Sequence, residues 1–119
     1  MTDGLIQPEL MSDDLANDYT PGFQAATPID DGAWHQVALV RSGVTVSLYI
    51  DGNVDATATT AQPSDVRNNE PLRAGMSVCV GIDGTQAFTG QLDELMIFQH
   101  ALNQGQIRAL TSVLVRSSA

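Results

Sequence analysis

The sequence predicts an all-β domain, an antiparallel β-sandwich with an extended N-terminal arm and one short helix near the C-terminus. Apolar residues alternate with polar ones along residues 44–51, which is the pattern of a strand that buries one face. The dipeptide Asp51-Gly52 follows, and it favours a hairpin because glycine tolerates the positive φ that tight turns need. Short apolar runs separated by turn residues recur at near-regular spacing, which favours a sandwich over an α/β fold.

The first 32 residues differ in composition from the rest and are predicted to form an acidic arm. They contain seven Asp and Glu residues and no Lys or Arg, and Pro8, Pro21 and Pro28 divide them into short pieces. Apolar residues are nevertheless spread through this stretch, more than a solvated tail would carry. We therefore divide the chain into an arm, residues 1–32, which lies on its own domain or on a neighbouring subunit, and a sandwich, residues 33–119.

Five runs after the arm have the composition of β-strands. The first of them has apolar residues on both faces, which predicts a central strand covered on both sides, and Ser42-Gly43 would close it in a tight turn. The expected strands are Trp34–Arg41, Val44–Ile50, Val54–Ala58, Leu72–Gly81 and Gln91–Gln99.

The end of the chain carries the start signal of a helix. Asn103 and Gln106 have the spacing of a capping box, in which each side chain accepts a hydrogen bond from the backbone amide of the other residue. Ile107 and Leu110 would then face the sandwich. The last apolar run, Ser112–Arg116, is predicted to add one more strand at an edge.

Composition argues against several classes of function. The 119 residues suffice for one domain and one core, and 14 acidic residues against five Arg leave a net charge of −9. Nucleic acid is not expected as a partner because phosphate binding needs clustered cations. No apolar run approaches the roughly 18 residues of a membrane span, so no membrane insertion is expected, and the N-terminus lacks the pattern of a signal peptide. Cys79, the single cysteine, cannot form an internal disulfide.

Two phrases of the sequence resemble a known family. Residues 33–52, AWHQVALVRSGVTVSLYIDG, are similar to the central hairpin of laminin-G-like, concanavalin A-like and pentraxin-like domains, and residues 90–107, GQLDELMIFQHALNQGQI, to their closing part. The resemblance covers residues 33–110 and implies a jelly-roll sandwich. Members of the family have several strands before the Trp-His hairpin, where this chain has only the arm. Because an uncovered sheet edge invites pairing, we expect a homo-oligomer or a chain docked through its arm on a larger protein assembly.

The resemblance also implies a calcium site near the closing strand. The matching positions are Asp83, in GIDGT, and Asp93, in QLDEL. Calcium takes six to eight oxygen ligands, so backbone carbonyls, Gln86 or acids of the arm would have to complete the site. The structural alternative, which we favour, is that Asp83 makes a turn while Asp93 and Glu94 make hydrogen bonds within the fold.

No catalytic arrangement is expected. Glycosidases place two carboxylates on either side of the scissile bond, whereas Asp93 and Glu94 are adjacent and would point to opposite faces of a strand. His35 has no recognisable Ser or Cys nucleophile beside it, and we interpret it as a structural or surface residue next to a core Trp34. The sequence therefore predicts a protein that is not an enzyme.

Two functions fit this fold. The first is a structural or assembly protein, an oligomeric surface component of a larger particle such as a phage capsid decoration or fibre protein, located in the virion. The second is a lectin-like glycan-binding or adhesion module, in one version dependent on calcium. Only 5% of the residues are aromatic, which disfavours sugar stacking, and together with the arm and the missing front strands this favours assembly. The polar glycan contacts would be Tyr49, Asn53, Asp83, Thr85 and Gln86.

Overall fold

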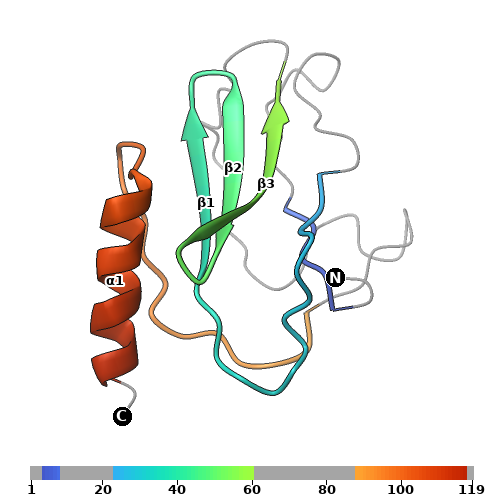
Figure 1. Cartoon of the computed structure of the whole chain (residues 1–119), viewed down its shortest axis with the longest axis vertical. Coiled ribbons are helices and arrows are strands. Elements are labelled where there is room, and N and C mark those ends of the chain that lie inside the picture. The colour runs from blue at the N-terminus through green and yellow to red at the C-terminus, as the bar shows by residue number, and fades with distance from the viewer. Residues whose placement is uncertain (1–3, 9–22, 61–87, 118–119) are drawn as a thin grey trace, which may run out of the picture.

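A three-stranded antiparallel sheet and one helix make up the regular structure of the described residues (Figure 1). The computed structural model describes residues 4–8, 23–60 and 88–117, so the predicted strand Leu72–Gly81 lies outside it. The helix stands beside the sheet, and residues 88–103 run below the strands before they rise to its start (Figure 1). The elements are β1 (Val37–Ser42), β2 (Thr45–Ile50), β3 (Asn53–Thr59) and α1 (Gln104–Ser117). In the sheet β2 lies between β1 and β3.

Two tight turns set the register of the sheet. Gly43 and Val44 connect β1 to β2, one residue later than the predicted turn, and Gly43 has a φ of 61°. Asp51 and Gly52 connect β2 to β3 with φ angles of 50° and 81°. Positive φ at both central residues is the geometry of a two-residue hairpin turn, so the Asp51-Gly52 prediction is confirmed.

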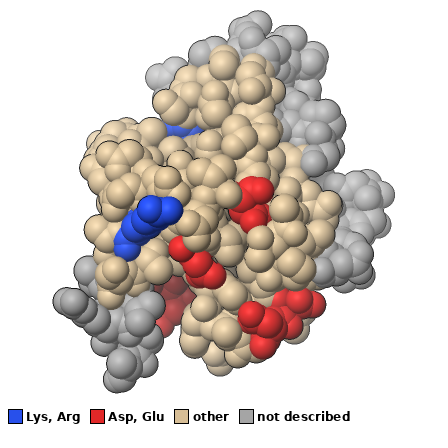
Figure 2. All heavy atoms as spheres, in the orientation of Figure 1, with Lys and Arg blue, Asp and Glu red and all other residues tan. Residues whose placement is uncertain are grey.

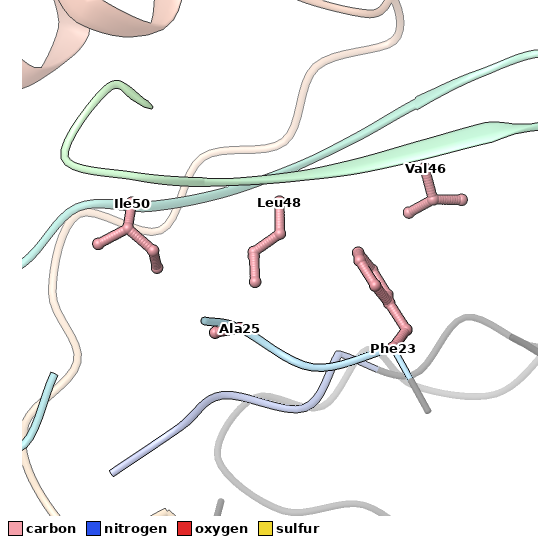
Figure 3. Packing of buried hydrophobic residues seen from close by; sticks show 5 residues of the cluster. All are labelled: Phe23, Ala25, Val46, Leu48 and Ile50. Carbon is pink, nitrogen blue, oxygen red and sulfur yellow. The ribbon is translucent and has the colours of Figure 1, made fainter. Parts of the chain in front are cut away.

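The core forms on one face of β2. Val46, Leu48 and Ile50 are 1%, 0% and 5% exposed, and they face Phe23 and Ala25 of the arm (Figure 3). The side chains between them on β2 are only half-buried, so the alternation in the sequence corresponds to a buried face and a partly open one. Burial of a large apolar side chain contributes about 1.5–3 kcal/mol, which makes this face the main source of stability in the sheet.

The described parts of the arm lie on this core face. The backbone amides of Ala25 and Ile29 donate hydrogen bonds to the carbonyl oxygens of Ile6 and Gly4, at 2.8 and 2.9 Å, so the two pieces of the arm lie side by side. Ile6 and Ile29 pack against the buried cluster. The apolar residues that are spread through the arm therefore serve, in the described residues, to cover its own sheet.

A β-bulge in β3 ties the arm to the sheet. The pairing of β2 with β3 shifts by one residue after Leu48, which leaves Asp55 without a partner in the ladder. The Asp55 carboxylate accepts hydrogen bonds from the backbone amides of Ala26 and Thr27, at 2.6 and 3.1 Å, and from the Thr27 hydroxyl. Burial is the largest single influence on the pKa of Asp55 and acts to raise it, but the three hydrogen bonds together lower the pKa below its ordinary value.

Among the described strands β1 is an outer one, not the doubly covered central strand that the sequence predicts. Val37 and Leu39 are paired with Ile50 and Leu48 and share their face, yet they are 42% and 43% exposed. The strand begins at Val37, and Trp34, expected in the core, is 63% exposed. Apolar residues on both faces of a strand cannot reveal which face is covered, because the cover comes from segments distant in the sequence.

Residues 91–99, predicted as a strand, have no regular secondary structure and are exposed throughout. Glu94 has a φ of 54°, a left-handed conformation that interrupts an extended strand, and its backbone amide donates to the Asp93 carboxylate at 2.8 Å. An apolar pattern indicates a segment whose side chains tend to be buried. A strand in addition needs a neighbouring strand with which its backbone N–H and C=O groups form hydrogen bonds. The strand prediction is wrong because no segment of the described chain supplies that partner.

The helix α1 is longer than predicted and replaces the edge strand expected at Ser112–Arg116. Ile107, Leu110 and Leu114 follow the spacing of three to four residues that is typical of a helix, and no Gly or Pro interrupts residues 106–117. Once a helix has started, each further residue gains a backbone hydrogen bond without a neighbouring strand. No helix in the described part combines the length and the apolar character that crossing a bilayer would require.

Truncation of Leu48 tests the core. Leu48→Ala removes a fully buried side chain and is expected to lower the free energy of unfolding by about 2–5 kcal/mol, because a cavity remains. Leu39→Ala is the matched control, since Leu39 lies opposite Leu48 on β1 but is 43% exposed, and it should cost about 1 kcal/mol or less. Urea unfolding measures both variants, and equal losses would mean that β1 is covered as fully as β2.

Candidate functional site

A set of hydrogen bonds joins the Asp51–Gly52 turn to α1, and we call this contact the turn–helix junction. The carbonyl oxygen of Gly52 accepts hydrogen bonds from Gln104 Nε2 and Arg108 Nε, both at 3.1 Å. Arg108 Nη2 donates to Asn53 Oδ1 at 3.0 Å. Gly52 is buried, and a Cβ at this position would lie 2.8 Å from Arg108 Cγ, so a residue without a Cβ lets the helix approach this closely.

Gln36, the residue before β1, is a second anchor of the helix. Its Nε2 donates to the carbonyl oxygen of Ile107 at 3.4 Å, and its Oε1 accepts a hydrogen bond from the Thr111 hydroxyl. Ile107 itself is 1% exposed, so an apolar contact accompanies the polar ones. The helix is therefore held by the turn after β2 and by the residue that leads into β1.

The start of α1 agrees with the sequence. Asn103 Oδ1 accepts from the backbone amide of Gln106, and Gln106 Oε1 accepts from the backbone amide of Asn103, both at 2.9 Å. This reciprocal pair is the predicted capping box, which is confirmed. Ile107 is buried and Leu110 is half-buried, so the predicted inward side of the helix is confirmed as well.

His35 lies between two carboxylates just before β1. Its Nδ1 is 2.8 Å from Asp51 Oδ2 and its Nε2 is 2.8 Å from Asp31 Oδ1, and the His35 side chain is 15% exposed. A neutral imidazole has only one N–H, and an ionised carboxylate only accepts hydrogen bonds. With both carboxylates ionised, only the positively charged ring, with both nitrogens protonated, can donate in both contacts. We call these three residues the His35 clamp.

The clamp shifts the pKa values of His35 and Asp31. The hydrogen bonds to Asp51 and then to Asp31 raise the pKa of His35 above its ordinary value, although burial acts against them. The hydrogen bond to His35 is also the main reason why the pKa of Asp31 is lowered. Asp51 in addition accepts from the backbone amide of Gln36 and donates its own amide to the Gln36 carbonyl, both at 2.9 Å. The clamp thus holds the turn against the residues that lead into β1.

Strand register, rather than a sequence motif, predicts that His35 lies near Asp51. Because Val37 is paired with Ile50, Gln36 must lie opposite Asp51, and His35 must lie next to that pair. The predicted turn lies one residue earlier and would place Trp34 opposite Asp51, which still leaves His35 next to that pair. Arg108 carries no comparable signal, because its position depends on how α1 packs against the sheet.

The clamp does not form a metal site. The two ring nitrogens of an imidazole point away from each other, so the carboxylates bonded to them do not converge on one ion. Within the described ranges, no group of three His, Cys, Asp or Glu residues is placed to hold a metal. The predicted calcium ligand Asp93 is exposed and uses Oδ1 on the Glu94 amide, whereas Asp83 lies outside the described residues. The calcium site therefore stays a prediction.

The predicted glycan contacts are described only in part. Tyr49 is half-buried in β2, and Asn53 begins β3 at the turn–helix junction. Asn53 Oδ1 accepts from Arg108, and its Nδ2 donates to the backbone of the turn at 3.4 Å. The described bonds of Asn53 are therefore those of the junction, and the glycan site stays a prediction. Thr85 and Gln86 lie outside the described residues.

Residues 92–98 expose five large apolar side chains, and we call this stretch the apolar segment. Soluble monomeric proteins rarely expose a contiguous apolar patch of large area, and such patches mark interaction sites. Asp93 and Glu94 are the only charged residues within the segment. The exposed fractions are 63% for Leu92, 72% for Leu95, 42% for Met96, 73% for Ile97 and 43% for Phe98.

Two comparisons relate the chain to known proteins. A laminin-G family model of the concanavalin A-like lectin/glucanases superfamily matches residues 4–108. The 2.1 Å crystal structure of residues 221–444 of an S-layer domain-containing protein from Clostridium thermocellum ATCC 27405 is similar, with 22% identity and a TM-score of 0.55. That match covers 74% of this chain and 43% of the other, so this chain spans less than half the length of the structure it resembles. A search of curated proteins found no match.

The family match confirms the predicted fold class. The superfamily has an antiparallel β-sandwich of the jelly-roll type, and the described sheet is antiparallel and followed by a C-terminal helix. The central hairpin, β1 with β2, and the start of α1 both lie within the matched residues. The apolar segment and the His35 clamp lie within them as well.

Substitution of Gly52 tests the turn–helix junction. Gly52→Ala puts a side chain into a left-handed turn, at a cost of about 1–2 kcal/mol, and also displaces Arg108 from its bonds to the turn, at about 0.5–1.5 kcal/mol for each bond lost. Gly43→Ala is the matched control, because Gly43 also has a positive φ but nothing lies within 4 Å of its added Cβ. Thermal or urea unfolding should show the larger loss for Gly52→Ala. Equal losses would mean that α1 does not pack against the turn.

Proposed function

The chain belongs to the laminin-G-like domains of the concanavalin A-like lectin/glucanases superfamily, and from this we propose that it is a non-catalytic structural module that assembles with copies of itself. In this proposal the chain is a surface component of a larger particle, such as a phage capsid decoration or fibre protein. The family fold by itself serves many functions, so the argument has to come from the surface of this chain.

The apolar segment is the observation that carries the proposal. Leu92, Leu95 and Ile97 are each more than 60% exposed. Full burial of a large apolar side chain contributes about 1.5–3 kcal/mol, and these three are already about one-third buried, so covering them supplies roughly 3–6 kcal/mol. Association of two chains costs about 4–15 kcal/mol in lost freedom of movement. The apolar segment alone is therefore marginal as an interface, and a stable assembly needs further apolar surface.

The core face of β1 offers that further surface. Val37 and Leu39 share a face with Ile50 and Leu48, which are almost fully buried, yet they are 42% and 43% exposed. The cover that the arm provides over β2 therefore does not extend fully over β1. A second copy that contacts this face would complete the burial of a sheet face that is already apolar.

The charge of the chain supports apolar rather than electrostatic association. The net charge is −9, so copies of the chain repel one another at long range. Figure 2 shows one face of the molecule, on which uncharged side chains predominate, acidic groups are scattered and basic groups are few. At 0.1 M salt, the repulsion between charges more than about 10 Å apart is largely screened. Self-association should therefore strengthen as salt is added.

The absence of catalysis is part of the proposal and rests on the carboxylates. Asp31, Asp51 and Asp55 are used in hydrogen bonds that hold the fold, and Asp93 is bonded to the neighbouring amide. Asp93 and Glu94 are too close in sequence to stand on either side of a glycosidic bond.

The similar solved structure belongs to an S-layer domain-containing protein, and a role in an assembled surface layer would suit the apolar segment.

Light scattering on the full chain tests the proposal. At about 100 μM, a hundredfold above a dissociation constant of 1 μM, the wild-type chain is expected to have a mass that is a multiple of the monomer mass. The double variant Leu95→Ser, Ile97→Ser should weaken association by roughly a thousandfold, because truncation of each central interface side chain costs about 2 kcal/mol, and it should therefore be mostly monomeric at the same concentration.

The double variant Gln91→Ser, Gln99→Ser is the matched control, because it changes two exposed polar residues at the ends of the same stretch. It should leave the mass unchanged. A wild-type chain that stays monomeric at this concentration and at 0.5 M salt would overturn the proposal, as would equal association of both double variants.

A further inference from the structure

The His35 clamp connects three parts of the chain through one ionised ring. Asp31 belongs to the arm, His35 leads into β1, and Asp51 belongs to the turn between β2 and β3. The ring contacts both carboxylates at 2.8 Å and is 15% exposed. When the ring loses a proton, one nitrogen becomes a lone-pair acceptor that faces a carboxylate oxygen, and that contact turns from attractive to repulsive.

Two residues of the clamp are adjacent in the chain to residues that bond to α1. Asp51 is adjacent to Gly52, whose carbonyl oxygen accepts the hydrogen bonds from Gln104 and Arg108 of α1. His35 is adjacent to Gln36, which bonds both to Asp51 and to the helix at Ile107. Gly52 and Gln36, which both anchor α1, are thus next in the chain to members of the clamp. A movement of the turn that breaks the clamp would also misalign the acceptors of the helix.

We propose that protonation of His35 holds α1 against the sheet, so that the helix is attached more tightly in acidic solution than in alkaline solution. The proposal does not depend on self-association, because the clamp and the junction both lie within one chain.

The charged groups around the ring set the direction of the effect. Asp31 and Asp51 contact the ring, and Arg108 is the charged residue that α1 contributes to the junction. The pKa of His35 is raised from 6.5, so its contribution is complete below pH 6.5 and is lost as the pH rises through the raised pKa. The pKa of Asp31 is lowered from 3.8, so its contribution is complete above pH 3.8 and is lost as the pH falls through the lowered pKa. The clamp is therefore strongest between these two values.

Hydrogen exchange on the full chain tests the proposal. The amides of residues 107–112 are expected to lose protection, after correction for the intrinsic exchange rate, by roughly fivefold or more between about pH 5.5 and about pH 9, the lower end of the usual coupling between linked sites. His35→Gln removes the titrating group, so protection of the same amides should be weak and nearly independent of pH. NMR titration of the two histidine rings follows the protonation directly, and the ring of His35 should titrate above pH 6.5.

Two further variants keep the test decisive if His35→Gln does not fold. Asp31→Asn leaves the contact with Asp51 in place but removes one carboxylate, so it should bring the titration of His35 to lower pH and reduce the change in protection. His100→Gln is the control, because it removes the second histidine and should leave both measurements unchanged. Protection that is the same across the pH range in the wild-type chain overturns the proposal, and so does a pH dependence that survives in His35→Gln.

Discussion

The close approach of α1 to the Asp51–Gly52 turn is the constraint on which much of the described structure depends. The turn determines the register of β2 with β3, because both of its residues adopt positive φ angles and so close the hairpin in two residues. The missing Cβ at Gly52 leaves room for Arg108, and the Gly52 carbonyl then becomes the acceptor for two side chains of the helix. One dipeptide therefore shapes the sheet and also places the helix.

A second constraint is that the described arm residues bury only part of one face of the sheet. Phe23 and Ala25 bury the inward side chains of β2, and the bulge at Asp55 fastens this part of the arm to β3. The same cover leaves Val37 and Leu39 on β1 nearly half exposed. A sandwich buries both sheets against each other, and the incompletely covered face and the exposed apolar segment are the surfaces on which the proposed self-association rests.

In the described part of this acidic chain, opposite charges meet locally around His35. With 14 acidic residues and five Arg, a cation placed among carboxylates is stabilised strongly, and His35 is placed in this way between Asp31 and Asp51. A histidine is the one side chain whose charge changes near neutral pH without a large perturbation. His35 is adjacent to Gln36, which bonds to the helix, and this position connects the charge of the His35 ring to the packing of α1.

Features that depend only on neighbouring residues could be predicted from the sequence. The alternation along β2, the glycine turn after it and the capping box at Asn103 follow from local geometry, and each is present in the structure. Four other features arise from contacts between distant segments: the exposure of Trp34, the lack of a strand at residues 91–99, the helix at 112–116, and the clamp around His35. The physical reason is that a backbone turn or a helix cap is satisfied within a few residues, whereas burial, strand pairing and the partners of a charged ring come from distant segments whose arrangement the local pattern does not specify.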